Sequence, residues 1–373
     1  MQGSRQVNDE TGVTCQGWGA MKIIDTDVHQ SWAGQDEVWN RIPEYFRAEN
    51  FQIPTGMLVN PVHVNRLDAV GPNGEPAGTD YELMKRQHLD PFGISRAVLT
   101  GNNILGLGVH PHAEFAKALA KAYNGALQDT WLTWDDRFFG SMLVAPQDPA
   151  AAAVEIRKLG SHPRIVEVLM CSATRIPLGQ KFYWPIYEAA EEMNLPVAVH
   201  PGTEGRGTSN GFIAGPPSTY LEWHTNLSQN YMGQIVSLVC EGVFEKFPRL
   251  KFVAKEGGLA WIPGVLWRLD KNWKALRSSV PWLRRLPSEY IIEHIRFTSQ
   301  PIEEPERPEF LPQLLEMIHA DKTLMFSSDY PHWDNDSPRH ALPRLSETLM
   351  KRILSENAEE TYPFEKAGSP VAV

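Results

Sequence analysis

The chain has 373 residues, of which 42% are hydrophobic and 21% are charged. This balance is typical of a globular protein, and it excludes disordered, collagen-like and coiled-coil chains. The formal net charge is −10, and no run of Lys and Arg offers the basic surface that nucleic-acid binding requires. We therefore expect no nucleic-acid partner.

The cysteine content and the hydropathy pattern predict a cytoplasmic protein without a membrane partner. The three cysteines are widely spaced and form no CxxC pair, which is typical of proteins in a reducing compartment. Residues 1–20 are polar and lack the apolar segment of a secretory signal. No apolar stretch is long enough to predict a spanning helix.

Eight short apolar runs alternate with longer helical patterns along the chain. The runs are rich in Val, Ile, Leu and Phe, as expected of strands that are buried on both faces. They lie at residues 23–28, 95–100, 138–145, 165–170, 196–200, 250–255, 295–299 and 324–328. Helical patterns lie at residues 113–134, 150–159, 184–193, 220–247, 309–319 and 343–354. This order predicts the α/β class and a (β/α)8 TIM barrel. A doubly wound open sheet is the alternative, but it would need a Gly-rich phosphate loop after the first strand.

The remaining segments predict a single barrel domain over residues 21–360. A flexible N-terminal segment (1–20) precedes this domain and a tail (361–373) follows it. A loop-rich insertion at residues 30–80 separates the first strand from the helix before the second. A Gly-rich loop at residues 201–219 follows the fifth strand, and a structureless segment of this length in a compact domain is usually functional.

Several predicted strands end in residues that can bind a metal, at the rim where the active site of a (β/α)8 barrel lies. In the first strand Asp25, Asp27 and His29 alternate and therefore share one face. A hydrogen-bonded core network is the alternative explanation of this polar stripe. His200 ends the fifth strand, and Asp329 ends the eighth.

Two further candidates lie beside these strand ends. Glu256 ends the sixth strand before two glycines, and His224 lies in the first turn of the helix after the Gly-rich loop. If the fold brings all of these groups to one rim, a bound cation would offset the cost of their negative charge. Imidazole and carboxylate together suit Zn, Mn or Fe, whereas an all-oxygen set would suit Mg or Ca. The predicted metal ligands are Asp27, His29, His200, His224, Glu256 and Asp329.

Three sequence strings resemble a known family. They are IDTDVH at 24–29, PVAVHP at 196–201 and FSSDYPHW at 326–333. The chain resembles the amidohydrolase-related (amidohydrolase 2) branch of the amidohydrolase superfamily, which includes aminocarboxymuconate-semialdehyde decarboxylase. The resemblance covers residues 21–355 and implies a metal-dependent (β/α)8 barrel.

The resemblance also implies a role for each matched position. The family usually has His-x-His at the end of the first strand, where this chain has Asp27 and His29. Its metal-binding His on the fifth strand matches His200. Its metal-binding Asp on the eighth strand matches Asp329, which would also help to activate a metal-bound water. On the sixth strand the family has a His before the glycines, whereas this chain has Glu256.

This departure leaves more than one reaction open. The first expectation is a hydrolase or non-oxidative decarboxylase of a small carboxylate-bearing substrate, with Asp329, Glu256 and His224 as catalytic groups. The alternative is a two-metal, di-iron monooxygenase that hydroxylates a small carboxylate or amino acid, because some relatives on this barrel resemble α-aminoisobutyrate hydroxylases. A monooxygenase would need a separate reductase. A third possibility is a metal-containing, non-catalytic partner subunit.

The expected ligands and partners follow from this resemblance. The cofactor is a divalent ion, Zn or Fe with Mn as a further option, in one or two copies per chain. Arg206, Arg175 and His332 are the predicted substrate-binding residues. The expected assembly is a homo- or hetero-oligomer that acts on a small molecule.

Overall fold

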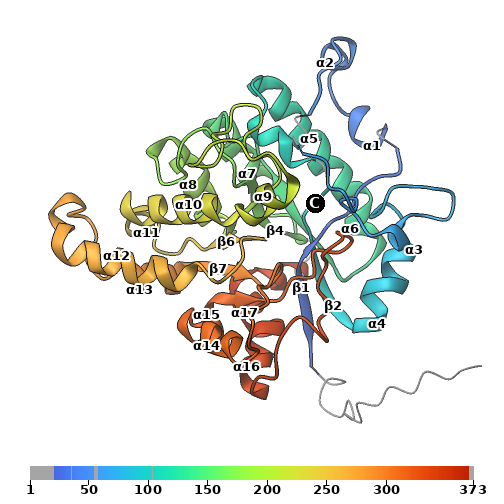
Figure 1. Cartoon of the computed structure of the whole chain (residues 1–373). Helices are drawn as coiled ribbons and strands as arrows, with labels where there is room; N and C mark the ends of the chain where they lie inside the picture. Colours follow the sequence, from blue (N-terminus) through green and yellow to red (C-terminus); the bar gives the residue numbers. More distant parts are fainter. Residues whose placement is uncertain (1–20, 35, 54–57, 103, 369–373) are drawn as a thin grey trace, which may run out of the picture.

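The computed structural model describes residues 21–34, 36–53, 58–102 and 104–368. In this part of the chain, eight parallel strands hydrogen-bond in chain order from β1 to β8, and helices surround them (Figure 1). The strands are β1 (Ile23–Val28), β2 (Ile94–Leu99), β3 (Phe138–Leu143), β4 (Ile165–Cys171), β5 (Val197–His200), β6 (Phe252–Ala254), β7 (Ile295–Thr298) and β8 (Leu324–Met325). Each overlaps a predicted run, so the (β/α)8 barrel is confirmed.

The barrel closes between β1 and the segment that follows β8. Asp329 N donates to the carbonyl oxygen of Asp27 over 3.0 Å, and His29 N donates to the carbonyl oxygen of Tyr330 over 2.7 Å. The strands are buried because they lie between the barrel interior and the helices; every residue of β1, β3 and β4 is buried. The closure places the end of β1 directly beside Asp329.

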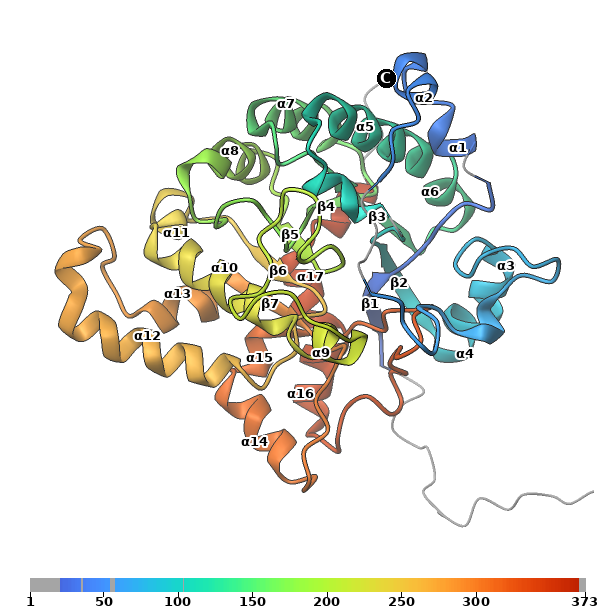
Figure 2. The ribbon, with the colours of Figure 1, turned by 45° about the horizontal axis from the view of Figure 1, so that its top comes forward.

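The helices form the outer layer (Figure 2). The longer ones are α5 (Ala113–Asp129), α7 (Pro149–Leu159), α8 (Trp184–Glu192), α10 (Ser228–Cys240), α12 (Ile262–Leu276), α13 (Pro287–His294) and α14 (Phe310–Met317). The shorter ones are α6 (Trp131–Trp134), α9 (Tyr220–Thr225), α11 (Val243–Lys246), α15 (Ala320–Thr323), α16 (Glu347–Lys351) and α17 (Asn357–Thr361). The predicted helix at 220–247 is therefore three helices. Gly242, in the left-handed region with φ of 74°, ends α10 in the way that glycine commonly ends helices.

The insertion after β1 covers the C-terminal rim of the barrel. Its described part contains only short elements, α1 (Asp36–Trp39), α2 (Glu44–Ala48) and a 3-10 turn at Leu67–Ala69, before α3 (Tyr81–Met84) and α4 (Asp90–Phe92) lead into β2. Asn65 forms a bridge with His332, and Arg66 N donates to the carbonyl oxygen of Pro331 over 2.9 Å. The insertion is loop-rich, as predicted, and it lies against the segment that carries Asp329.

The packed chain continues beyond residue 360, where we expected the tail to begin. Tyr362 and Phe364 are each only 3% exposed, and the Phe364 ring lies 4.7 Å from the Phe139 ring in β3. Burial of these aromatic side chains holds the segment on the barrel. The predicted N-terminal segment at 1–20 lies outside the described residues. Among the helices of the described ranges, none has the length and apolar character to cross a membrane.

Candidate metal centre

Four side chains from three strands meet at the C-terminal rim of the barrel. Asp27 belongs to β1 and His29 directly follows it, His200 ends β5, and Asp329 follows β8. One donor atom of each lies within 4.8 Å of the donor atoms of the other three. All four residues are at most 3% exposed. The fold thus brings together four of the six predicted ligands.

Backbone carbonyl groups fix the orientation of both imidazoles. His29 Nδ1 lies 2.6 Å from the carbonyl oxygen of Gly101, and His200 Nδ1 lies 2.8 Å from that of Pro201. Because a carbonyl oxygen only accepts, each Nδ1 carries a proton, so in the neutral, metal-binding form of each imidazole Nε2 has a free lone pair. Both Nε2 atoms are buried, without a hydrogen-bond partner among the described residues. A metal-binding imidazole usually donates one ring N–H to a carbonyl or carboxylate oxygen and binds the metal through the other nitrogen.

The two aspartates face these lone pairs. Asp329 Oδ1 lies 2.8 Å from His29 Nε2, and Asp27 Oδ2 lies 3.4 Å from His200 Nε2. A carboxylate oxygen that faces a lone pair at this distance is repelled unless a positive charge lies between them. The set therefore fits a divalent ion, which two imidazoles and two carboxylates can bind together.

The charges of the site favour a cation. Although burial raises the pKa of Asp27, Lys255 and His200 lower it far below its ordinary value. For Asp329, burial raises the pKa and His332 lowers it, with a net value of about 2. Both aspartates are therefore ionised at neutral pH. Burial lowers the pKa of His200, but Asp27 and a neighbouring carboxylate raise it well above its ordinary value, so this position holds a proton that a metal would displace.

Glu256 approaches the same point from the end of β6. Its Oε2 lies 3.0 Å from His200 Nε2. This carboxylate oxygen, like those of the two aspartates, would be repelled by a lone pair on Nε2 unless a positive charge lies between them. Glu256 and Asp329 both have a left-handed backbone, with φ of 55° and 60°. Glu256, Asp329 and His332 form a second group of donors within 4.8 Å of one another. His332 Nδ1 donates to Asp329 Oδ2 over 2.8 Å.

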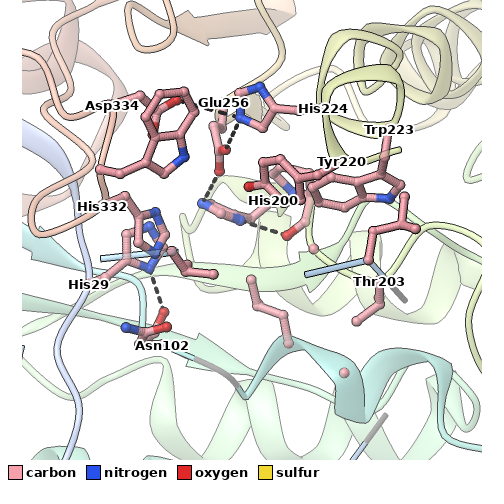
Figure 3. A pocket seen from close by; sticks show the side chains of 18 residues that line it. His29, Asn102, His200, Thr203, Tyr220, Trp223, His224, Glu256, His332 and Asp334 are labelled. Carbon is pink, nitrogen blue, oxygen red and sulfur yellow. Dashed lines mark hydrogen bonds and ion pairs between the residues drawn. The ribbon is translucent and has the colours of Figure 1, made fainter. Parts of the chain in front are cut away.

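His224, the sixth predicted ligand, lies farther from the four central donors. It is in the last turn of the six-residue helix α9, whereas we expected it in the first turn of one long helix. Its Nε2 lies 3.9 Å from Glu256 Oε1 and 3.5 Å from Asp334 Oδ2. Figure 3 shows His224 near both carboxylates, beside the cavity. It belongs to neither group of close donors.

The donors open onto a cavity of about 180 Å³ (Figure 3). The apolar and aromatic part of its wall consists of Leu58, Val64, Leu105, Tyr220, Trp223 and Trp333. The polar part includes His29, Asn102, His200, Thr203, His224, Glu256, His332 and Asp334. No Arg or Lys occurs among the described residues that line the cavity.

Of the three predicted substrate-binding residues, only His332 lines this cavity. Arg206 and Arg175 do not, and Arg175 is exposed. The Gly-rich loop lines the cavity as far as Thr203, and it then runs to Val109, whose carbonyl oxygen accepts from Thr208 N over 2.8 Å. In this structure neither arginine lies on the wall of the cavity, and for Arg206 the reason is the course of the Gly-rich loop away from the cavity.

Sequence reasoning missed a charged group below the metal site. Lys255 directly follows β6 and is fully buried, and its Nζ lies 2.6 Å from Glu167 Oε1 in β4. A Lys and a Glu within apolar strands are a signal that could have found this pair, because buried charges are paired. Asp334, on the wall of the cavity, was also missed.

The chain is similar to known proteins in sequence and in fold. A gamma-resorcylate decarboxylase from Rhodococcus jostii (strain RHA1) is 26% identical over 264 residues, which cover 68% of this chain and 78% of that protein. The structure of 5-carboxyvanillate decarboxylase from Sphingomonas paucimobilis has a TM-score of 0.65 and 22% identity, and the match covers 92% of this chain and 99% of that one.

A second solved structure was determined with a metal. The 5-carboxyvanillate decarboxylase from Novosphingobium aromaticivorans DSM 12444, in complex with manganese and 4-hydroxy-3-methoxy-5-nitrobenzoic acid, has a TM-score of 0.68 and 20% identity. This match covers 91% of this chain and 96% of that one. The sequence family described as Amidohydrolase matches residues 24–364. The chain therefore belongs to the amidohydrolase family.

Proposed function

We propose that this enzyme removes the carboxyl group of a small aromatic monocarboxylate as CO2, without oxidation and with a divalent metal as cofactor. The observation that carries the proposal is a four-residue donor set that opens onto a cavity walled by aromatic side chains. The relatives named above are decarboxylases, which supports decarboxylation over hydrolysis. They give no support to the monooxygenase or to the non-catalytic subunit.

Asp27, His29, His200 and Asp329 are the proposed ligands of the metal. When bound, the ion would supply positive charge that holds the substrate carboxylate in place. Mn²⁺ suits this mixture of imidazole and carboxylate ligands, and a manganese-bound relative supports that choice over Zn or Fe.

The size and wall of the cavity indicate the class of substrate. An apolar cavity of about 150 Å³ holds a benzene molecule, so about 180 Å³ suits a molecule with one ring. The rings of Tyr220 and Trp223, with centroids 5.4 Å apart, offer faces on which an aromatic ring can stack. Glu256 and Asp334 accept hydrogen bonds from a hydroxyl or amino substituent and repel a second carboxylate. The expected substrate is therefore a hydroxy- or amino-substituted benzoate with one carboxyl group.

The reaction needs one proton. The bond between the ring carbon and the carboxyl carbon breaks, its electron pair stays on the ring carbon, and this carbon takes up the proton as CO2 leaves. His332 lines the cavity, and its Nδ1 donates to Asp329 Oδ2 behind it over 2.8 Å. Burial lowers the pKa of His332, but Asp329 raises it to about 9. This pair is the proposed proton donor.

Glu256 and His224 have a different proposed role. Glu256 stands beside the metal position, 3.0 Å from His200 Nε2, and His224 lies between Glu256 and Asp334. Together they form a hydrogen-bonding wall that can orient a ring substituent. Such orientation places the carboxyl group at the metal and the ring carbon at the proton donor.

The test is the release of CO2 from a panel of substituted benzoates by the Mn²⁺-loaded enzyme in D2O. We expect stoichiometric CO2 and a product with one deuterium at the carbon that lost the carboxyl group. Dicarboxylates should react poorly, and Asp329→Ala should abolish turnover. Arg175→Ala, which changes an exposed residue outside the cavity, is the matched control. Hydrolysis of esters or amides without CO2 release would refute the proposal.

A further inference from the structure

Lys255 is fully buried beneath the proposed metal site. Its Nζ lies 2.6 Å from Glu167 Oε1, donates to Thr100 Oγ1 over 3.0 Å, and lies 3.7 Å from Asp27 Oδ1. Lys255, Glu167 and Thr100 are all 0% exposed. Lys255 is not among the residues that line the cavity. Any effect of this charge on the reaction must therefore act through its neighbours.

The burial of this ion pair needs a reason, because stability does not supply one. Removal of two charges from water costs several kcal/mol per ion, and apolar residues of similar volume often stabilise a protein as well or better. Glu167 also accepts a hydrogen bond from Ser141 Oγ. Residues within or directly after five strands, β1, β2, β3, β4 and β6, thus form one buried charge network.

The network ends on the outer oxygen of a proposed metal ligand. Thr100 Oγ1 donates to Asp27 Oδ1, and Lys255 Nζ lies on the same side. The other oxygen, Oδ2, faces His200 Nε2 at 3.4 Å. One oxygen of Asp27 is therefore held by the network, and the other is directed at the metal position.

We infer that Lys255 is a positioning residue that holds Asp27 for one-oxygen coordination of the metal and thereby sets the affinity of the site for divalent ions. Glu167 anchors Lys255, and Thr100 completes the link to Asp27. Hydrogen bonds behind a ligand commonly change metal affinity by about 10- to 100-fold. The inference depends on the proposed ligand set, not on the proposed reaction.

The main experiment separates this role from a purely structural one. Lys255→Met leaves Glu167 buried without its partner, so we expect both a lower Tm of the metal-free protein and a lower Mn²⁺ affinity. The double variant Lys255→Met/Glu167→Met replaces the pair by apolar side chains. We expect this variant to regain the Tm but to keep an affinity about 10- to 100-fold below that of the unmodified chain. Free Mn²⁺ during titration, measured by electron paramagnetic resonance, gives the affinity without any assay of activity.

Two further variants keep the test informative if Lys255→Met fails to fold. Thr100→Val preserves shape but removes the hydroxyl link to Asp27, and it should also lower the affinity. Lys251→Met changes a half-buried Lys just before β6 whose Nζ donates to the carbonyl oxygen of Glu293; it should leave the affinity unchanged. The inference is overturned if the double variant and Thr100→Val both bind Mn²⁺ as tightly as the unmodified chain. If Mn²⁺ binds well but no benzoate is decarboxylated, only the proposed function fails.

Discussion

Removal of the metal should lower the thermal stability of this protein by a predictable amount. The proposed donors are held by the folded barrel and are far apart along the chain, so an unfolded chain binds the ion poorly. At an Mn²⁺ concentration of about 100 times Kd, binding stabilises the folded state by about 2.7 kcal/mol. For 373 residues, an unfolding entropy of about 2.1 cal/mol/K per residue corresponds to a Tm shift of about 3 to 4 °C.

The assay is a thermal melt of chelator-treated protein across a series of Mn²⁺ concentrations. The Tm should rise by about 2 °C for each tenfold increase in Mn²⁺ above Kd, because each tenfold step adds about 1.4 kcal/mol. His200→Ala removes one imidazole ligand and should abolish the shift in this range. His110→Ala is the matched control, since His110 packs against Phe115 and lies outside both donor groups.

Two outcomes would refute the reasoning. One is an unmodified chain whose Tm does not depend on Mn²⁺, Zn²⁺ or Fe²⁺, which would mean that the donor set binds no ion tightly. The other is His200→Ala with the same Mn²⁺-dependent shift as the unmodified chain, which would place the ion elsewhere. The quantity compared is the difference between the Tm with Mn²⁺ and the Tm without metal, measured for each variant separately. A substitution that changes the metal-free Tm therefore does not affect the comparison.

Three other predictions concern the walls around the site. Gly207→Ala should lower the free energy of unfolding, measured by urea titration. The left-handed backbone at Gly207, with φ of +53°, would by itself cost about 1–3 kcal/mol. The added Cβ would also lie 2.0 Å from the carbonyl oxygen of Val109, and this clash adds to the loss. Trp223→Ala should raise the KM for an aromatic substrate about tenfold through lost stacking and burial, measured by initial rates of CO2 release. Arg175→Ala should change KM less than about twofold in the same assay, because an exposed charge outside the cavity contributes little.

The fold could be predicted because its signals are local. Each strand is a short apolar run, and the helical patterns between them are long enough to cover a barrel. The metal-binding candidates could be predicted from a single geometric rule, that parallel strands of a barrel end at one rim. His200 and Asp329 followed from this rule alone, and Asp27 and His29 also needed the alternation of side chains along a strand.

The residues that the sequence did not reveal depend on contacts across the barrel. Lys255 follows β6 and Glu167 lies in β4, which are not neighbours in the sheet, so each buried charge signals a partner but its own strand does not show which residue that partner is. His224 was predicted in the correct region, but the break between α9 and α10 changes its distance from the metal position. Arg206 and Arg175 were chosen for their charge, whereas the paths of several loops in the folded chain decide which residues reach the cavity.

The left-handed backbone at Glu256 and Asp329 has a consequence for the evolution of this enzyme. Among residues other than glycine, Asn, Asp and His adopt this conformation most readily, and β-branched residues adopt it with difficulty. A change of Glu256 to Asp, Asn or His should therefore cost less backbone strain than a change to a β-branched residue. The charge of the side chain at position 256 can thus vary while the barrel and the four central donors stay the same. New reactions on this scaffold can arise from such exchanges without any new loop.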